Sequence, residues 1–186
     1  MKRFGILALW ALFWAFAAVP KDYYPHAIGM TWRYTSGEVQ TFVERREMEG
    51  QEVWMLEHRY ADGARMVEAL AFRDDGVWVL AVESAGETLV YDPPLKLYPP
   101  PPLRKGLSWQ QTTTLRGQTI ELSAYVLGVE GVEVPAGKFN AYRIQTRLRA
   151  AGGAESVVDL YFVPGVGVVR YATADGGVID LVEFSR

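Results

Sequence analysis

Glycine recurs at a fixed interval through the first half of this chain. Gly37, Gly50, Gly63 and Gly76 are each 13 residues apart, and Gly86 follows ten residues later. Glycine accepts the positive φ that tight hairpin turns require, and each of these glycines has turn-forming neighbours. The segments between them are rich in Val, Trp, Thr, Phe and Leu. The spacing therefore predicts strands of about eight to ten residues joined into an antiparallel meander.

Alternation of apolar and polar residues extends this prediction into the second half. In residues 119–126 and 142–149, apolar side chains alternate with polar ones, which is typical of a sheet with one buried and one wet face. No convincing amphipathic helix follows residue 25. We therefore expect an all-β fold of about ten antiparallel strands. Because strands twist and open edges aggregate, a sheet of that size should form a strongly curved sheet or an incomplete barrel.

The two halves of the chain also resemble each other. A Pro-x-x-x-Gly-x-x-Trp segment, a Glu-Gly-x-Glu-Val segment and an apolar hexapeptide ending in Phe occur twice, in the same order. The matching residues are Trp32 and Trp109, Glu49 and Glu130, and Phe72 and Phe162. These matches predict a duplicated five-strand unit, with half-repeats at about 25–91 and 102–184. The alternative is that two meanders reuse the same turn chemistry.

A proline-rich segment separates the two half-repeats. Prolines 99–102 are consecutive, and Asp92 is followed by two more. Consecutive prolines favour polyproline II and are excluded from central strands. We therefore predict a stiff crossover at 92–102 within a single β domain that spans 18–186.

The N-terminus has the features of an export signal. Lys2 and Arg3 precede an apolar stretch at 4–18, which at 1.5 Å per residue reaches about 22 Å and falls short of a bilayer core. We predict a signal peptide at 1–17, a mature chain that starts at Ala18, and export to the periplasm or cell envelope with no stable membrane span after cleavage. An uncleaved anchor is the alternative. Charges at 44–47 load both faces of a predicted strand, which disfavours a transmembrane barrel.

Composition excludes several kinds of chemistry. Lys plus Arg is 19 against 22 for Asp plus Glu, a net charge of −3 that argues against nucleic-acid binding. The chain has no cysteine, which removes disulfides, thiolate metal sites and cysteine catalysis. His26 and His58 are the only histidines, and no G-x-S-x-G motif is present. We expect no cofactor and no metal site, and we interpret His58 as a structural or exposed residue.

A hydrolase that uses two carboxylates is an alternative that the residues leave open. Strand spacing hides which acids face each other, and a carboxylate pair can hydrolyse glycosidic bonds. Glu68 and Asp159, which we assign to matching positions of the two halves, are the candidate pair. A structural role for both is the competing interpretation.

Two segments resemble hairpins of a known family. Residues 134–142, VPAGKFNAY, resemble a VPAG-[ST]-F-x-[AT] hairpin, and residues 161–169, YFVPGVGVV, resemble a WYxPGVGLV hairpin. The two occur together in a family of exported bacterial proteins of unknown function. That family is similar in its β-rich architecture to the lipoprotein-localisation-factor (LolA/LolB-like) group. The resemblance covers roughly residue 23 to the C-terminus, although Lys138 replaces the usual Ser or Thr.

The resemblance implies a curved sheet in the cell envelope, no catalytic residues and, by analogy, a hydrophobic cavity for acyl chains. We therefore expect a non-enzymatic envelope protein that binds a lipid-like ligand, with a lipid or lipoprotein as partner. An interaction or assembly module that uses sheet edges or the proline tract is the alternative. In residues 142–149 the arginines should face solvent or the rim, opposite the apolar face. The residues predicted to contact ligand are Trp32, Trp54, Trp109, Tyr142, Ile144, Leu148 and Arg147.

Overall fold

The computed structural model describes residues 22–186, so the predicted signal peptide 1–17 and the cleavage at Ala18 lie outside the described residues. Twelve strands form in this part of the chain, and each pairs antiparallel with the next. They are β1 (Thr31–Tyr34), β2 (Val39–Met48), β3 (Gln51–Arg59), β4 (Arg65–Arg73), β5 (Gly76–Ser84), β6 (Glu87–Tyr98), β7 (Ser108–Leu115), β8 (Gln118–Val134), β9 (Gly137–Ala150), β10 (Glu155–Val163), β11 (Gly167–Thr173) and β12 (Val178–Ser185).

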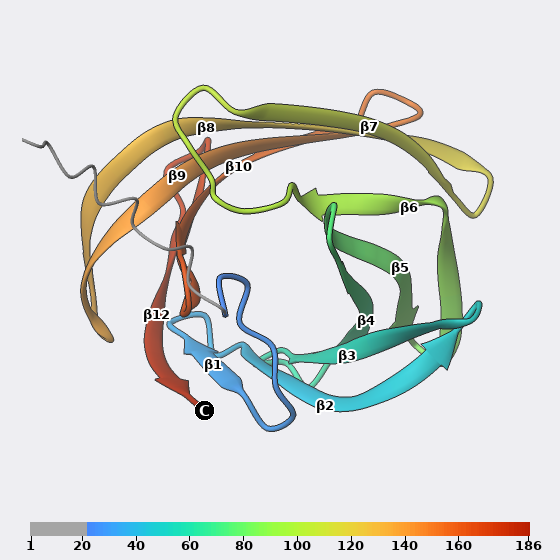
Figure 1. Ribbon diagram of the computed structural model, residues 1–186, viewed down its shortest axis with the longest axis horizontal. Coiled ribbons are helices and arrows are strands. Elements are labelled where there is room, and N and C mark those ends of the chain that lie inside the picture. The colour runs from blue at the N-terminus through green and yellow to red at the C-terminus, as the bar shows by residue number, and fades with distance from the viewer. Residues whose placement is uncertain (1–21) are drawn as a thin grey trace, which may run out of the picture.

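The strands close into a barrel because β12 pairs with β1 (Figure 1). The predicted all-β antiparallel meander is confirmed. The expected number of about ten strands and the incomplete barrel are wrong, since the described residues form twelve strands in a closed ring. One reason that the ring closes is the length of β6, which continues through residues 92–94, part of the segment predicted as crossover. The connection between β6 and β7 is therefore shorter than 92–102 and occupies 99–107.

The seam between β6 and β7 explains how prolines fit into a strand. Pro93 and Pro94 have no backbone N–H to donate, and the ladder keeps a single register pair there. Side chains of β7 supply donors to the free carbonyl groups instead: Gln111 Nε2 donates to Pro94 O at 2.6 Å, and Thr113 Oγ1 to Pro93 O at 2.6 Å. The Gln111 carboxamide oxygen also accepts the Lys96 N–H at 2.7 Å.

Each half of the chain contributes six strands, β1–β6 and β7–β12. Trp32 and Trp109 are the second residues of β1 and β7, and Phe72 and Phe162 are the last but one of β4 and β10. The matched residues thus take the same strand positions in both halves. The duplication itself stays a prediction, to be tested by superposing 25–91 on 102–184.

One end of the barrel is occupied by the segment before β1, which is drawn inside the ring of strands in Figure 1. Tyr24 Oη donates to Pro99 O at 2.8 Å, and Tyr23 O accepts the Gly165 N–H at 3.1 Å. Pro99 and Gly165 both follow even-numbered strands, so this segment, residues 22–30, lies at the end where even strands lead into odd ones. We call it the plug segment and this end the plugged end.

The walls of the barrel carry apolar side chains on both faces. On β3 and β4, even-numbered residues face inward and odd-numbered ones outward, as strand alternation requires. A separate cluster is buried on the outer face of β3–β5. Its buried members are Val53, Met55, Val67, Ala69, Ala71, Leu80 and Ala81. This wall is therefore held by packing on two sides, and its inward side chains need not fill the interior.

Candidate ligand-binding cavity

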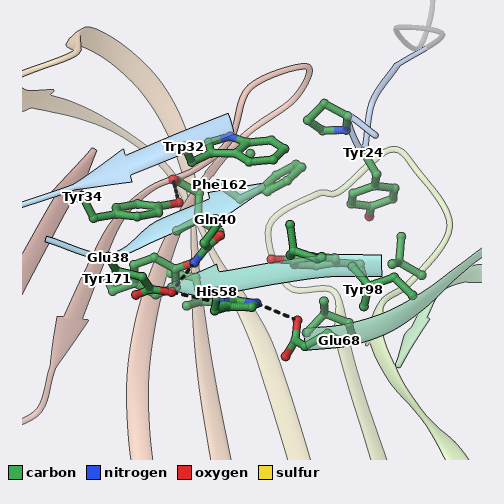
Figure 2. A pocket seen from close by; sticks show the side chains of 18 of the residues that line it. Tyr24, Trp32, Tyr34, Glu38, Gln40, His58, Glu68, Tyr98, Phe162 and Tyr171 are labelled. Carbon is green, nitrogen blue, oxygen red and sulfur yellow. Dashed lines mark hydrogen bonds and ion pairs between the residues drawn. The ribbon is translucent and has the colours of Figure 1, made fainter. Parts of the chain in front are cut away.

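The interior of the barrel holds a cavity of about 470 Å³, which falls within the usual range for small-molecule sites. It extends from Tyr24 and Pro25 of the plug segment to residues near the opposite end, where odd strands lead into even ones. Its wall is mainly aliphatic and aromatic (Figure 2). The apolar lining residues are Trp32, Tyr34, Phe42, Leu56, Tyr60, Met66, Leu70, Phe72, Val77, Leu97, Tyr98, Val158, Leu160, Phe162, Val168, Tyr171 and Ile179.

Trp32 is held in this wall by a hydrogen bond and by contacts with a second aromatic ring. Its indole Nε1 donates to Val166 O at 2.6 Å, and it packs against Phe184 with ring centroids 5.4 Å apart. Gly167 allows the close approach, since a Cβ there would lie 3.0 Å from the indole nitrogen and its φ is +107°. Gly167, the first residue of β11, therefore leaves room for an aromatic ring of the cavity wall.

Three ionisable side chains stand in a row on the cavity wall: Glu38 before β2, His58 on β3 and Glu68 on β4 (Figure 2). His58 Nδ1 lies 2.8 Å from Glu38 Oε1, and Nε2 lies 3.4 Å from Glu68 Oε2. The second contact has the distance of an ion pair, but Nε2 is buried and has no hydrogen-bond partner among residues 22–186. We refer to these three residues as the Glu–His–Glu cluster.

The carboxylates decide the protonation of His58. Burial by itself would lower its pKa, but the hydrogen bond to Glu38 and the negative charges of Glu38 and Glu68 outweigh burial and raise the pKa to about 9. Burial likewise opposes ionisation of Glu38, yet the hydrogen bonds from His58 and Gln40 hold its pKa below the usual value. Gln40 Nε2 donates to Glu38 Oε1 at 2.9 Å. At neutral pH the histidine is therefore an imidazolium between two acids.

This arrangement suits electrostatic recognition better than metal binding. Within residues 22–186, no group of three or more His, Cys, Asp or Glu side chains is arranged to hold a metal ion. In the Glu–His–Glu cluster both imidazole nitrogens face carboxylates, and a protonated imidazole has no lone pair to offer a metal. Nearby aromatic rings complete the surroundings: Tyr60 stacks on His58 with centroids 6.4 Å apart.

Of the seven residues predicted to contact ligand, Trp32 lines the cavity and the other six do not. Trp54 packs edge-on against His26 of the plug segment, at 4.8 Å between ring centroids. Ile144 is fully buried, and it belongs with Tyr142 and Trp109 to the packed core beside the cavity. Leu148 is 37% exposed. Arg147 is an exposed residue of the outer surface, paired with Glu155 at 2.8 Å.

The arginines of β9 all have carboxylate partners on the outer face. Arg143 donates to Asp159 at 2.6 Å, and Arg147 and Arg149 share Glu155. This is the side opposite Ile144, as the alternation in residues 142–149 predicts. None of these cations reaches the cavity wall.

The predicted carboxylate pair is divided between two faces of the barrel. Glu68 lines the cavity, whereas Asp159 lies on the outer face of β10 in its ion pair with Arg143. The residue that corresponds to Glu68, counted from Phe72 and Phe162, is Val158. The assignment of Asp159 to the matching position was wrong by one residue, which in a strand moves a side chain to the other face. Glu68 and Asp159 therefore cannot act on one substrate as a pair.

The sequence patterns predict neither Glu38 as a cavity residue nor the role of His58. The signal for part of the cluster is present in the sequence: Glu68 interrupts an alternating apolar series, Met66, Leu70 and Phe72. A carboxylate on the apolar face of a strand marks a buried charge that needs a partner. Glu38 lies in a turn, where no periodicity predicts its direction.

No family model and no curated protein sequence matches this chain. Two solved structures are similar. One is a candidate lipoprotein from Parabacteroides distasonis, 12% identical, with a TM-score of 0.48 and coverage of 88% of this chain and 98% of that chain. The other is a candidate exported protein with a YmcC-like fold from Bacteroides fragilis, 13% identical, with a TM-score of 0.47 and coverage of 89% and 99%. Within residues 22–186, no helix has the length and apolar composition that crossing a membrane requires.

Proposed function

We propose that this protein is a non-enzymatic, exported protein of the cell envelope that binds an apolar or lipid-like ligand inside its barrel. The observation that carries the proposal is the cavity of about 470 Å³ with its aromatic and aliphatic wall. Barrels of this kind usually fill their interior with side chains unless the interior holds a ligand. Burial of an acyl chain contributes about 0.8 kcal/mol for each CH₂ removed from water, so a cavity of this size supports useful affinity.

The N-terminal residues support the envelope part of the proposal, since their basic start and short apolar run favour export. The resemblance of two hairpins to exported bacterial proteins, and through them to the LolA/LolB-like group, points the same way. The predicted partner is accordingly a lipid or lipoprotein. The non-enzymatic part is supported by the separation of Glu68 from Asp159, which places the predicted carboxylate pair on two different faces of the barrel.

Adjacent valines of β10 provide a matched test. Val158 lines the cavity, while its neighbour Val157 points to the other face, and both are half-buried. Val158→Trp should fill the cavity and weaken uptake of the neutral fluorescent probe N-phenyl-1-naphthylamine at least tenfold. Val157→Trp adds the same ring outside and should leave probe binding within about twofold of the wild type.

Circular dichroism and thermal melting of both variants check that each is folded. Wild-type protein that takes up no probe would contradict the proposal, as would equal losses in the two variants. Native mass spectrometry of protein purified from its own envelope fraction should detect a bound apolar molecule in the wild type and less of it in Val158→Trp.

A further inference from the structure

The charges that line the cavity are unbalanced. Among the residues that the structure describes, its wall contains Glu38, Glu68 and His58 and no lysine or arginine. With the histidine protonated, two carboxylates face one cation, so one negative charge stays uncompensated in a largely apolar enclosure. A buried charge without a partner is costly, and folded proteins normally supply one.

Acids on the outer face of the same wall show what a balanced site looks like. Glu57 is as buried as His58, next to it on β3, yet it is held by both Arg59 and Arg65. Asp159 likewise has Arg143. The inward acids differ because their shared partner is a single histidine, and Glu68 meets it at 3.4 Å without a hydrogen bond.

The position of Glu68 leaves room for another cation. Its side chain is 24% exposed and borders the cavity, whereas that of Glu38 is 14% exposed and already accepts from His58 and Gln40. His58 Nε2, the donor that faces Glu68, is buried and makes no hydrogen bond within residues 22–186. Within the described residues Glu68 accepts no hydrogen bond, so its carboxylate oxygens are available to a ligand.

Aromatic rings near this end also favour positive charge. Tyr60 and Tyr171 line the cavity, and ring faces attract ammonium groups. Burial raises the pKa of Tyr60, and the negative charges of Glu38 and Glu68 raise it further. The field that these tyrosines experience is therefore negative, which would repel the carboxylate of a fatty acid or a phosphate group.

We infer that the cavity is selective for amphiphiles with a cationic head, an amine or quaternary ammonium, held at Glu68 with the apolar part directed toward Tyr24 and the plug segment. The inference rests on the proposed function and narrows it to one ligand class. An anionic amphiphile would bring a second uncompensated charge into the enclosure. A cationic one neutralises the charge that is already there.

Head-group competition in the wild-type protein tests the selectivity. Dodecyltrimethylammonium, dodecanol and dodecanoate have the same alkyl chain and differ in charge. Each displaces bound N-phenyl-1-naphthylamine below its micelle concentration, with circular dichroism to verify folding. We expect the ammonium compound to displace the probe at a concentration at least tenfold lower than dodecanoate, with dodecanol between them. Equal potency of all three, or a preference for dodecanoate, would overturn the inference.

Two near-isosteric variants test the assignment to Glu68. Glu68→Gln removes the inward acid and should cut the preference for ammonium over dodecanoate about tenfold. Asp159→Asn removes an acid of the outer face and should leave the preference unchanged. The same loss in both variants, or no loss in Glu68→Gln, would show that Glu68 does not hold the head group.

These outcomes distinguish a failure of the proposed function from a failure of the charge selectivity alone. Absence of probe uptake by the wild type would remove the proposed function and the selectivity together. Uptake of the probe with no charge preference would remove only the selectivity and leave an unselective apolar site.

Discussion

The two halves of the barrel place different chemistry at corresponding positions of their strands. Phe72 and Phe162 align β4 with β10, and cross-strand pairing then relates β3 to β9 and β2 to β8. At three of these corresponding positions the first half has a polar or charged residue and the second half has an apolar one. The pairs are Glu68 and Val158, His58 and Leu148, and Gln40 and Leu122.

This difference teaches that the fold does not require the charges. The second half shows that Val and Leu are compatible with the same register, and burying apolar groups is favourable where burying charges is not. The first half keeps a Glu–His–Glu cluster despite its desolvation cost. A binding role, as proposed above, accounts for that cost, and the predictions below test whether the cost is real.

The largest effect should come from His58→Leu, which introduces the residue type of the second half into the first. It leaves the half-buried carboxylates of Glu38 and Glu68 without the cation that they share. Removing one member of a buried ion pair costs about 3–5 kcal/mol, and we expect a loss of that size in the free energy of unfolding. Urea denaturation monitored by tryptophan fluorescence measures it.

A triple variant, in which all three residues of the Glu–His–Glu cluster are replaced by uncharged ones, is the control for His58→Leu. Glu38→Gln, His58→Leu and Glu68→Val combined should recover most of the lost stability, because no unpaired charge is left. A triple variant as unstable as His58→Leu would contradict this account and would mean that packing at position 58, rather than charge, determines the loss.

A pH dependence of stability follows from His58. Its pKa is raised from an ordinary 6.5 to about 9 by the two carboxylates, which outweigh burial. The stabilisation is therefore fully present below pH 6.5 and is lost as pH rises through about 9. At 1.36 kcal/mol per pKa unit, it amounts to about 3 kcal/mol. Unfolding free energies between pH 6 and 9.5 should fall in the wild type.

The triple variant serves as the reference for this measurement because it keeps the other titrating groups. Its stability should change much less over the same pH range. Parallel curves for wild type and triple variant would exclude His58 as the titrating group. At the acid end the sign reverses: the pKa of Glu38 is lowered, so its contribution is present above its ordinary pKa and is lost as pH falls.

Much of the architecture could be predicted from sequence, because it depends on local signals. Glycine spacing and alternation each act within a single hairpin, and together they predict the meander and the outward arginines of β9. Closure could not be predicted in this way. Besides the pairing of β12 with β1, it depends on Gln111 and Thr113, which donate to the carbonyl oxygens of Pro94 and Pro93 across the seam between β6 and β7. No local pattern reveals these contacts.

The cavity shows the same limit. His58 has apolar neighbours at alternate positions, Trp54 and Leu56, so an inward direction could have been inferred from β3 alone. Its meeting with Glu38 requires the pairing of β2 with β3 and the course of the turn before β2. The packed positions of Tyr142 and Ile144 likewise depend on how the plug segment fills the plugged end.

The stability of the seam between β6 and β7 should depend on the side chain of Gln111. Gln111→Leu removes the acceptor of the Lys96 N–H and the donor to Pro94 O, and it leaves these two half-buried backbone groups without their partner. We expect a loss of about 2 kcal/mol in the free energy of unfolding. Gln110→Leu, on the exposed face of the same strand, should change it by less than about 0.5 kcal/mol. Equal small effects would show that the seam does not depend on this side chain.

The smallest expected effect is the difference in stability between variants of Trp32 and Trp109, which lie in the first strand of each half. Trp32 donates its indole N–H to Val166 O at 2.6 Å, whereas the Nε1 of Trp109 is buried without a partner. Trp32→Phe should therefore lose about 1 kcal/mol through the missing hydrogen bond. Trp109→Phe removes an unsatisfied donor, which offsets the packing lost with the smaller ring, so its stability should stay within about 0.5 kcal/mol of the wild type.

Chemical denaturation followed by circular dichroism measures both variants on equal terms, since each loses one fluorophore. A loss at Trp109 as large as that at Trp32 would mean that its N–H has an acceptor, such as an ordered water, and that the two halves satisfy this tryptophan equally well.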